Sequence, residues 1–173
     1  RLSAYKAQCN GNNFVVFFQE NSDSVPDKNA IKQICNRDTG VGVDGFIIVQ
    51  TSCEGYDFKM DYYNNDGSWE TMCANGALCV IKILLNRDYV FSYNIFLAGD
   101  GDHQLRIEGN DIYIRMKPPK LKTKDLDIRG YIGAHVDSGA RHFVTKSDVT
   151  DIDEIYKIAQ IIRYDESFSP TGL

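Results

Sequence analysis

Several features that would assign this chain to a protein class at once are scarce or absent. No stretch is rich in lysine and arginine, and the net charge is −5 at pH 7, which argues against a nucleic-acid partner. The nearest basic candidate, residues 117–124, is interrupted by two prolines. No window approaches the roughly 18 apolar residues of a spanning helix, and no charged-then-apolar leader opens the chain. We therefore expect a cytoplasmic protein that binds neither nucleic acid nor membrane.

The cysteines also lack the spacing of a structural framework. There are five, an odd number, with no Cys-x-x-Cys pair. This pattern is typical neither of a disulfide scaffold nor of a zinc site, so we expect reduced thiols and no metal. What is present is the composition of a globular protein, 43% hydrophobic and 25% charged. A chain of 173 residues buries on the order of 70% of the surface that its unfolded form exposes, which is enough for a real core.

Apolar runs and their periodicity predict strands and helices in mixed order. The predicted strands cover residues 14–18, 44–50, 56–63, 90–97, 104–108, 111–116, 131–136 and 142–145. The predicted helices cover residues 27–36, the apolar segment after Cys73, and residues 151–162. The prolines of residues 117–120 interrupt the pattern. We therefore predict two domains, residues 1–117 and residues 118–173.

The helix after Cys73 is apolar almost all the way round, from Ala77 to Leu85. A helix of this kind is expected to be buried on every side, as it would be if strands wrapped around it. Cys79 lies within the apolar run and is predicted to be a core residue.

Cys73 itself lies at the start of this helix, beside a turn-prone segment. The first N–H groups of a helix have no partners within it and carry the positive end of its dipole, which favours a thiolate and a bound anion. A small buried cysteine is an equally good interpretation. A functional thiol could be a nucleophile, a redox group, or an acid/base that moves a proton at carbon. A nucleophile usually needs a histidine such as His142 as its base, and a redox group needs a nearby thiol. An acid/base at carbon needs only the charge stabilisation and anion site that the helix start provides.

A polar cluster at residues 9–13 precedes the first apolar run. Clusters of this kind form either a plain turn or a loop that faces a ligand, and the composition favours the turn. Asn12 is therefore a candidate binding residue only if the cluster forms a loop that faces a ligand, which is the less favoured interpretation.

Residues 64–68 and 73–77 together resemble the first-half signature of the diaminopimelate epimerases. The chain reads Asn-Asn-Asp-Gly-Ser, four residues, Cys-Ala-Asn-Gly-Ala, and the family pattern is Asn-x-Asp-Gly-Ser, four residues, Cys-Gly-Asn-Gly. Further motifs resemble the family in order and spacing, at residues 11–14, 36–45, 98–99, 139–142, 162–163 and 168–170. The resemblance covers essentially the whole chain.

This resemblance implies an α+β fold of two similar halves, each a mixed β-sheet curled into a barrel around a central apolar helix, with the second half incomplete here. It implies an amino-acid epimerase that needs no cofactor. One cysteine of the family removes the α-proton as a thiolate, and a second returns a proton on the opposite face. By position, Cys73 is one of that pair, and the N–H groups of Ala74 and Asn75 would hold the substrate carboxylate. Asn12 and Asn64 would bind substrate polar groups, and His142 would tune the thiols.

The chain departs from the family pattern at several positions. Ala74 replaces a glycine, Leu78 a usual arginine, and Ala140 and Arg141 a small polar residue or asparagine followed by proline. No motif with a second catalytic cysteine follows within the 173 residues. We therefore expect the chain to be part of a longer protein, inactive alone, whose reaction is epimerisation of LL-2,6-diaminopimelate to the meso form.

Three alternatives to this reaction remain. They are epimerisation of another amino acid such as histidine or proline, a non-catalytic binding module, and a related isomerase of the same fold without a thiol pair. The expected partner is an amino-acid substrate, and a second copy of the chain is a further candidate.

Overall fold

A computed structural model describes residues 3–19 and 24–168. The motif residues Ser169 and Pro170 lie outside this part of the chain. The chain divides into two compact units, Arg1–Met116 and Lys117–Leu173.

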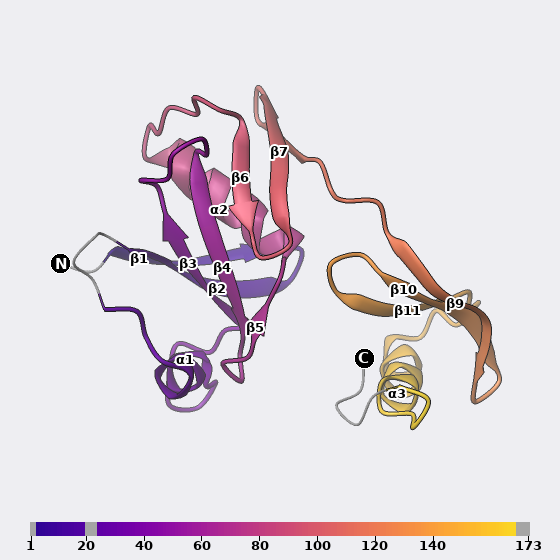
Figure 1. The fold of residues 1–173 in the computed structure, drawn as a ribbon. Helices are drawn as coiled ribbons and strands as arrows, with labels where there is room; N and C mark the ends of the chain where they lie inside the picture. Colours follow the sequence, from indigo (N-terminus) through magenta and orange to yellow (C-terminus); the bar gives the residue numbers. More distant parts are fainter. Residues whose placement is uncertain (1–2, 20–23, 169–173) are drawn as a thin grey trace. The chain divides into compact units, whose positions relative to one another are not determined.

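The first unit is built on one mixed sheet (Figure 1). Its strand order is β1-β2-β3-β4-β6-β7-β8, and β5 pairs with β4 beside this path. The pairs β2–β3 and β4–β6 are parallel and the other neighbours antiparallel. The strands are β1 (Ser3–Cys9), β2 (Asn12–Phe18), β3 (Gly45–Gln50), β4 (Phe58–Asn64), β5 (Trp69–Glu70), β6 (Ile95–Ala98), β7 (Gly101–Glu108) and β8 (Asp111–Ile114).

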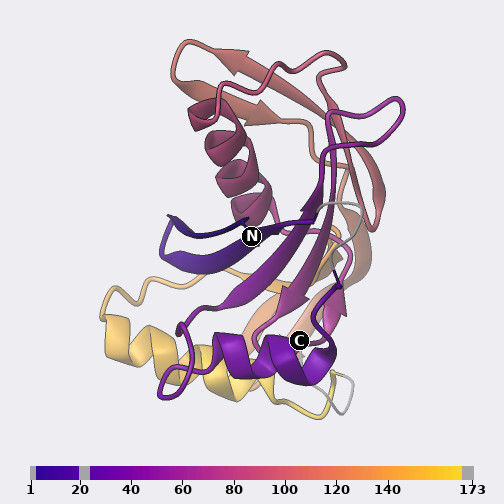
Figure 2. The same cartoon turned by 90° about the vertical axis from the view of Figure 1, so that its left-hand side faces the viewer.

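The sheet curls around helix α2 (Ala74–Asn86). The helix contacts β1, β2 and β8, and β1 and β8 are the two ends of the strand order. A helix can touch both ends only if the sheet bends around it, as Figure 2 shows. Val80, Ile81 and Leu84 are completely buried there, and burying each such side chain contributes about 1.5–3 kcal/mol. The predicted α+β fold with a curled mixed sheet is confirmed.

The outer face of β2 and β3 is also buried, because helix α1 (Lys28–Cys35) covers it. Asp27 caps α1 by accepting a hydrogen bond from the N–H of Ala30, 2.8 Å away. Burial on both faces explains why residues 14–18 and 45–49 are continuous apolar runs rather than alternating ones.

The prediction that α2 is buried on every side is wrong along one stripe. Leu78 and Leu85 are half-buried and Lys82 is exposed. These residues recur at helical spacing, so the curled sheet leaves one face of the helix uncovered.

The strand predicted over residues 90–97 begins only at Ile95. The carboxylate of Asp57, which is only 1% exposed, accepts hydrogen bonds from the N–H groups of Ser92, Tyr93 and Ile95 at 2.6, 3.1 and 3.2 Å. This segment is therefore wrapped around a buried carboxylate and cannot pair as a strand.

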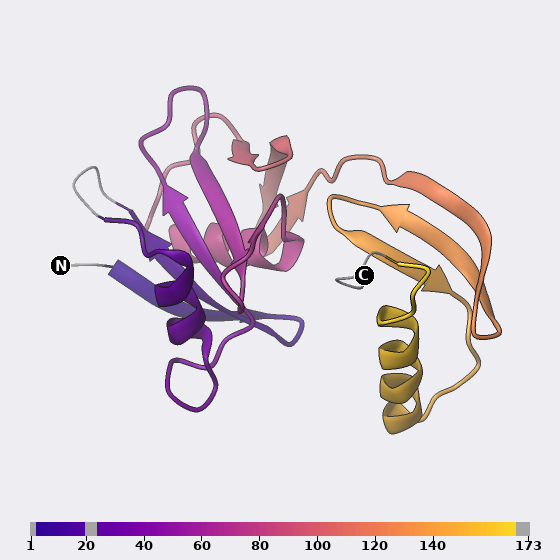
Figure 3. The same ribbon diagram turned by 60° about the horizontal axis from the view of Figure 1, so that its bottom comes forward.

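The second unit is a three-stranded antiparallel sheet with one helix beside it (Figure 3). Its elements are β9 (Lys120–Ile128), β10 (Tyr131–Asp137), β11 (Arg141–Thr145) and α3 (Ile152–Arg163). Ile128, Ile162 and Phe168 form its small core. Ile152 and Ile155 of the predicted apolar stripe are exposed, at 78% and 44%. Across residues 3–19 and 24–168, none of the helices has the length and apolarity to cross a membrane.

Asp165 forms several hydrogen bonds at the end of this unit. Its carboxylate accepts hydrogen bonds from the hydroxyl and N–H of Ser167 at 2.7 and 3.0 Å and from Arg129 Nε at 2.9 Å. Hydrogen bonds from Ser167, followed by the one from Arg129, lower the pKa of Asp165 to about 2. Because the folded-state pKa is depressed, the stabilisation is present above the ordinary aspartate pKa and is lost as pH falls towards 2.

Asp165→Asn is therefore expected to lower the melting temperature at pH 7 and to leave it nearly unchanged at pH 2. Circular dichroism melts at both pH values measure this, with Asp148→Asn, at an exposed position, as the control. An equal loss at both pH values would show that the ionised carboxylate is not what stabilises the unit.

Candidate active site at the start of the central helix

Cys73 is the N-cap residue of α2. Its sulfur accepts a hydrogen bond from the N–H of Gly76 at 3.4 Å. The side chain thus occupies the place that Ser, Thr, Asp or Asn usually takes at a helix start. Ala74 is the first helical residue and has no positive φ, so alanine fits where the family has glycine.

Two opposing effects act on the Cys73 thiol. Burial raises its pKa, whereas hydrogen bonds from the N–H groups of Gly76 and Asn75 lower it. Burial is the larger effect, so the net shift is upward. The helix start thus acts on the thiol in the predicted direction, but burial outweighs it. The N–H groups only reduce the cost of ionisation that burial imposes.

Alkylation of Cys73 is expected to have its midpoint at a higher pH than in the unfolded chain, because the folded-state pKa is raised. Iodoacetamide labelling from pH 6 to 11, read by mass spectrometry of the peptide that contains Cys73, measures this. The same peptide in urea-unfolded chain is the control. A folded-state midpoint at or below the control would mean that the helix N–H groups dominate over burial.

Three asparagines join the β1–β2 turn to the second residue of α2. Asn75 Nδ2 donates to Asn12 Oδ1 at 2.7 Å, and Asn10 Nδ2 donates to Asn75 Oδ1 at 3.2 Å. Asn10 and Gly11 form the tight turn, with φ of 50° and 87°. The segment is therefore a turn that contacts the start of α2, and the structure brings together Asn12 and Asn75.

Asn64 ends β4 on the side that faces α2, and it belongs to a compact turn. Its N–H donates to Ser68 O at 2.8 Å, and the N–H of Gly67 donates to Asn64 O at 2.9 Å. Hydrogen bonds from Ser68 lower the pKa of Asp66, which accepts from the Ser68 N–H at 2.8 Å. The motif over residues 64–68 is thus a turn stabilised by hydrogen bonds among its own residues, which fix the position of Asn64.

Two glycines of the motifs lie where the packing is close. A Cβ on Gly76 would lie 2.7 Å from Ile47 Cδ1, so the helix start packs tightly on β3. A Cβ on Gly99 would lie 2.4 Å from the Trp69 ring and 2.9 Å from Thr71 Cα, just before Cys73 in the chain. These glycines set the path of the backbone on both sides of the thiol.

Cys9, at the end of β1, lies near Cys73, which the sequence motifs do not reveal. It packs against the same core as Cys73. Burial, followed by the charges of Cys9 and Cys73, raises the pKa of Cys79 to about 11. Cys79 is 4% exposed, as predicted for a core residue. Three of the five cysteines therefore gather near the start of α2.

The predicted residue His142 is on β11 of the second unit, opposite Val136 and exposed to solvent, and its role in tuning the thiols stays a prediction. Ala140 and Arg141 precede it in the same unit. Leu78 lies on the half-buried stripe of α2, in the first unit.

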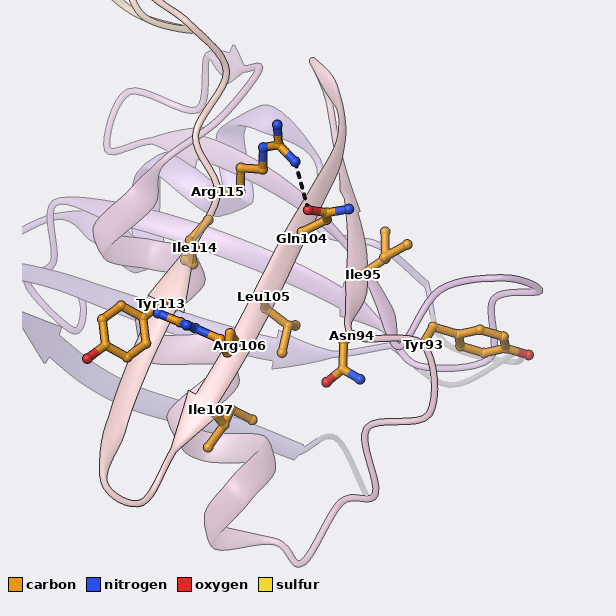
Figure 4. Close-up of a pocket in the computed structure, with 10 residues that line it drawn as sticks. All are labelled: Tyr93, Asn94, Ile95, Gln104, Leu105, Arg106, Ile107, Tyr113, Ile114 and Arg115. Carbon is orange, nitrogen blue, oxygen red and sulfur yellow. Dashed lines mark hydrogen bonds between the residues drawn. The ribbon is translucent and has the colours of Figure 1, made fainter.

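A separate pocket lies on β6, β7 and β8 and contains none of the predicted site residues (Figure 4). Arg106 covers the ring of Tyr113 at 4.5 Å, and Arg115 donates to Gln104 at 3.1 Å.

Among residues 3–19 and 24–168, no group of three His, Cys, Asp or Glu side chains could hold a metal ion.

Solved structures similar to this chain share its fold. A hydroxyproline epimerase from Agrobacterium vitis, with bound trans-4-hydroxy-L-proline, matches with a TM-score of 0.62 and 10% identity. The match covers 84% of this chain and 51% of that one. A Bacillus anthracis phenazine biosynthesis protein of the PhzF family matches with a TM-score of 0.54 and 18% identity, over 83% and 53% of the two chains.

Sequence comparisons agree with the motifs. Diaminopimelate epimerases from Aquifex aeolicus and Flavobacterium psychrophilum are each 30% identical to this chain over 99% of its length. The matches cover 66% and 65% of those proteins, so the chain spans just under two thirds of them. The family model described as diaminopimelate epimerase matches residues 4–122. With the ordered motifs and the curled sheet, these matches show that the chain belongs to the diaminopimelate epimerase family.

Proposed function

We propose that the full-length protein is an amino-acid epimerase that converts LL-2,6-diaminopimelate to the meso form without a cofactor. The observation that carries the proposal is the position of Cys73, a thiol that caps the central helix within the family signature. The names of the relatives support the substrate. The product would serve the biosynthesis of lysine and of cell-wall precursors.

In the proposed reaction the protons balance between two thiols. The Cys73 thiolate takes the α-proton and becomes a thiol. A second cysteine, in a part of the protein outside this chain, gives its proton to the opposite face of the carbon and becomes a thiolate. The α-carbon is inverted, and no electrons leave the substrate.

The start of α2 suits this chemistry because it stabilises negative charge. Backbone N–H groups at Ala74 and Asn75 would bind the substrate carboxylate, as helix N-termini bind anions. The N–H groups of Asn75 and Gly76 already lower the pKa of the thiol against the effect of burial. Asn12, held by Asn75, would bind a polar group of the substrate.

A panel of L-amino acids separates the proposed substrate from the alternatives. Full-length protein is incubated with LL-2,6-diaminopimelate, L-histidine, L-proline and trans-4-hydroxy-L-proline, and the products are resolved by chiral chromatography. We expect the meso product from the first alone. Leu78, where the family usually has arginine, is the reason to include the others. Inversion of one of these in place of diaminopimelate would assign a different substrate to the same chemistry.

A further inference from the structure

Tyr62 lies beside the candidate site but belongs to none of the matched motifs. It is on β4, where Phe58, Met60 and Tyr62 share the face that packs on the core around α2. Asn64 follows two residues later, so it faces the same side. The phenol and the amide are therefore neighbours on one face of one strand.

The ring of Tyr62 is held by its surroundings. A Cβ on Gly45 would lie only 2.4 Å from Tyr62 Cε2 and 3.0 Å from the hydroxyl oxygen, so glycine at position 45 makes room for the ring. Phe14 meets the ring edge-on, with 6.2 Å between the centroids. These contacts leave the hydroxyl group at a fixed place.

That hydroxyl donates a hydrogen bond to Asn64 Oδ1 at 3.0 Å. At the other end of the amide, Asn64 Nδ2 donates to Ser68 Oγ at 3.1 Å. The two bonds together hold both ends of the amide and fix its plane. Because an amide has two N–H donors and two lone pairs, one of each remains for another partner.

We infer that Tyr62 is a positioning residue for Asn64, which it holds in the orientation that presents the remaining N–H and lone pair to the polar groups of an amino-acid substrate. This inference rests on the proposed function, in which Asn64 binds substrate. Tyr62 acts through Asn64 and touches no reacting atom.

The state of the phenol is consistent with this role. Burial, followed by the charge of the nearby Cys73 thiolate, raises the pKa of Tyr62 far above its ordinary value. The hydroxyl therefore keeps its proton and remains a donor throughout the range in which a thiol titrates. Formation of the thiolate does not release Asn64.

Tyr62→Phe removes the hydroxyl and keeps the ring in its place against Gly45 and Phe14. In the full-length protein we expect KM for LL-2,6-diaminopimelate to rise about three- to tenfold, the range for loss of one hydrogen bond, while kcat changes less than twofold. An interaction that positions a binding group acts equally on the ground state and the transition state, so it appears in KM.

Tyr63→Phe is the matched control. Tyr63 is the next residue of β4 and packs against the core on the opposite face of the sheet. This variant is expected to leave both KM and kcat unchanged. Thermal melts of both variants show whether either effect is one of folding.

A second measurement keeps the inference testable if the proposed substrate is wrong. The side-chain amide signals of Asn64 in a ¹⁵N-labelled full-length protein should shift in Tyr62→Phe and stay in place in Tyr63→Phe. Unmoved Asn64 signals, or an unchanged KM, would overturn the role of Tyr62. Absence of turnover by the unmodified protein would instead contradict the proposed function, and the amide signals would still decide the role of Tyr62.

Discussion

Cys73→Ser is expected to reduce α-proton exchange by the full-length protein about 10²- to 10⁴-fold, the range for loss of a positioned acid/base. Serine can still accept the hydrogen bond from the Gly76 N–H that Cys73 accepts at 3.4 Å, since serine is a good N-cap. The helix start therefore remains, while the thiol is replaced by a hydroxyl group that is far less acidic.

The matched control is Cys53→Ser. Cys53 is partly exposed and donates to Gln50 O at 3.6 Å, in the loop after β3. Its replacement is expected to leave exchange unchanged. If Cys73→Ser retained more than a tenth of the activity, the thiol would not be the base, and the candidate site would be a binding site only.

Asp57→Ala is expected to lower the free energy of unfolding of the first unit by about 3 kcal/mol or more, since three N–H groups would lose a buried charged acceptor. The N–H groups of Ser92, Tyr93 and Ile95 hold residues 92–95 through this carboxylate. Their loop leads directly into β6, so its release would also loosen the pairing of β6 with β4.

Urea unfolding followed by the fluorescence of Trp69 measures this effect, because Trp69 is the one tryptophan of the 173 residues. Asp61→Ala is the control. Asp61 pairs with Lys59 at 3.1 Å and is 25% exposed, and a pair of this kind contributes about 0–1 kcal/mol. Similar losses of unfolding free energy in the two variants would show that Asp57 contributes no more to stability than a partly exposed ion pair does.

The elements with strong apolar patterns were predictable, and the polar ones were not. Helix α1, helix α2 and the β7–β8 hairpin follow from apolar spacing, a long apolar run and a turn between two apolar strands, respectively. Strand β9 has no such signal because it is exposed along almost all its length and pairs through its backbone with β10. Strand β5 is only two residues long, too short for any periodicity.

In the candidate site, residues in contiguous motifs could be predicted from the sequence, whereas contacts between distant residues could not. Cys73 and Asn64 are recognisable because their motifs are contiguous. The bond between Asn12 and Asn75 joins residues that are 63 positions apart, and no local pattern predicts it. The position of Tyr62 beside Asn64 could be predicted, because alternation along β4 places the two residues on the same face of the strand.

Deuterium incorporation tests the central claim most directly. Full-length protein with Cys73 reduced is incubated with LL-2,6-diaminopimelate in D₂O, and the α-carbon is followed by NMR or mass spectrometry. We expect deuterium to enter at the α-carbon as the meso isomer accumulates, because the thiols exchange their protons with solvent. Absence of exchange with Cys73 intact and reduced would contradict the assignment of this thiol to proton transfer at carbon.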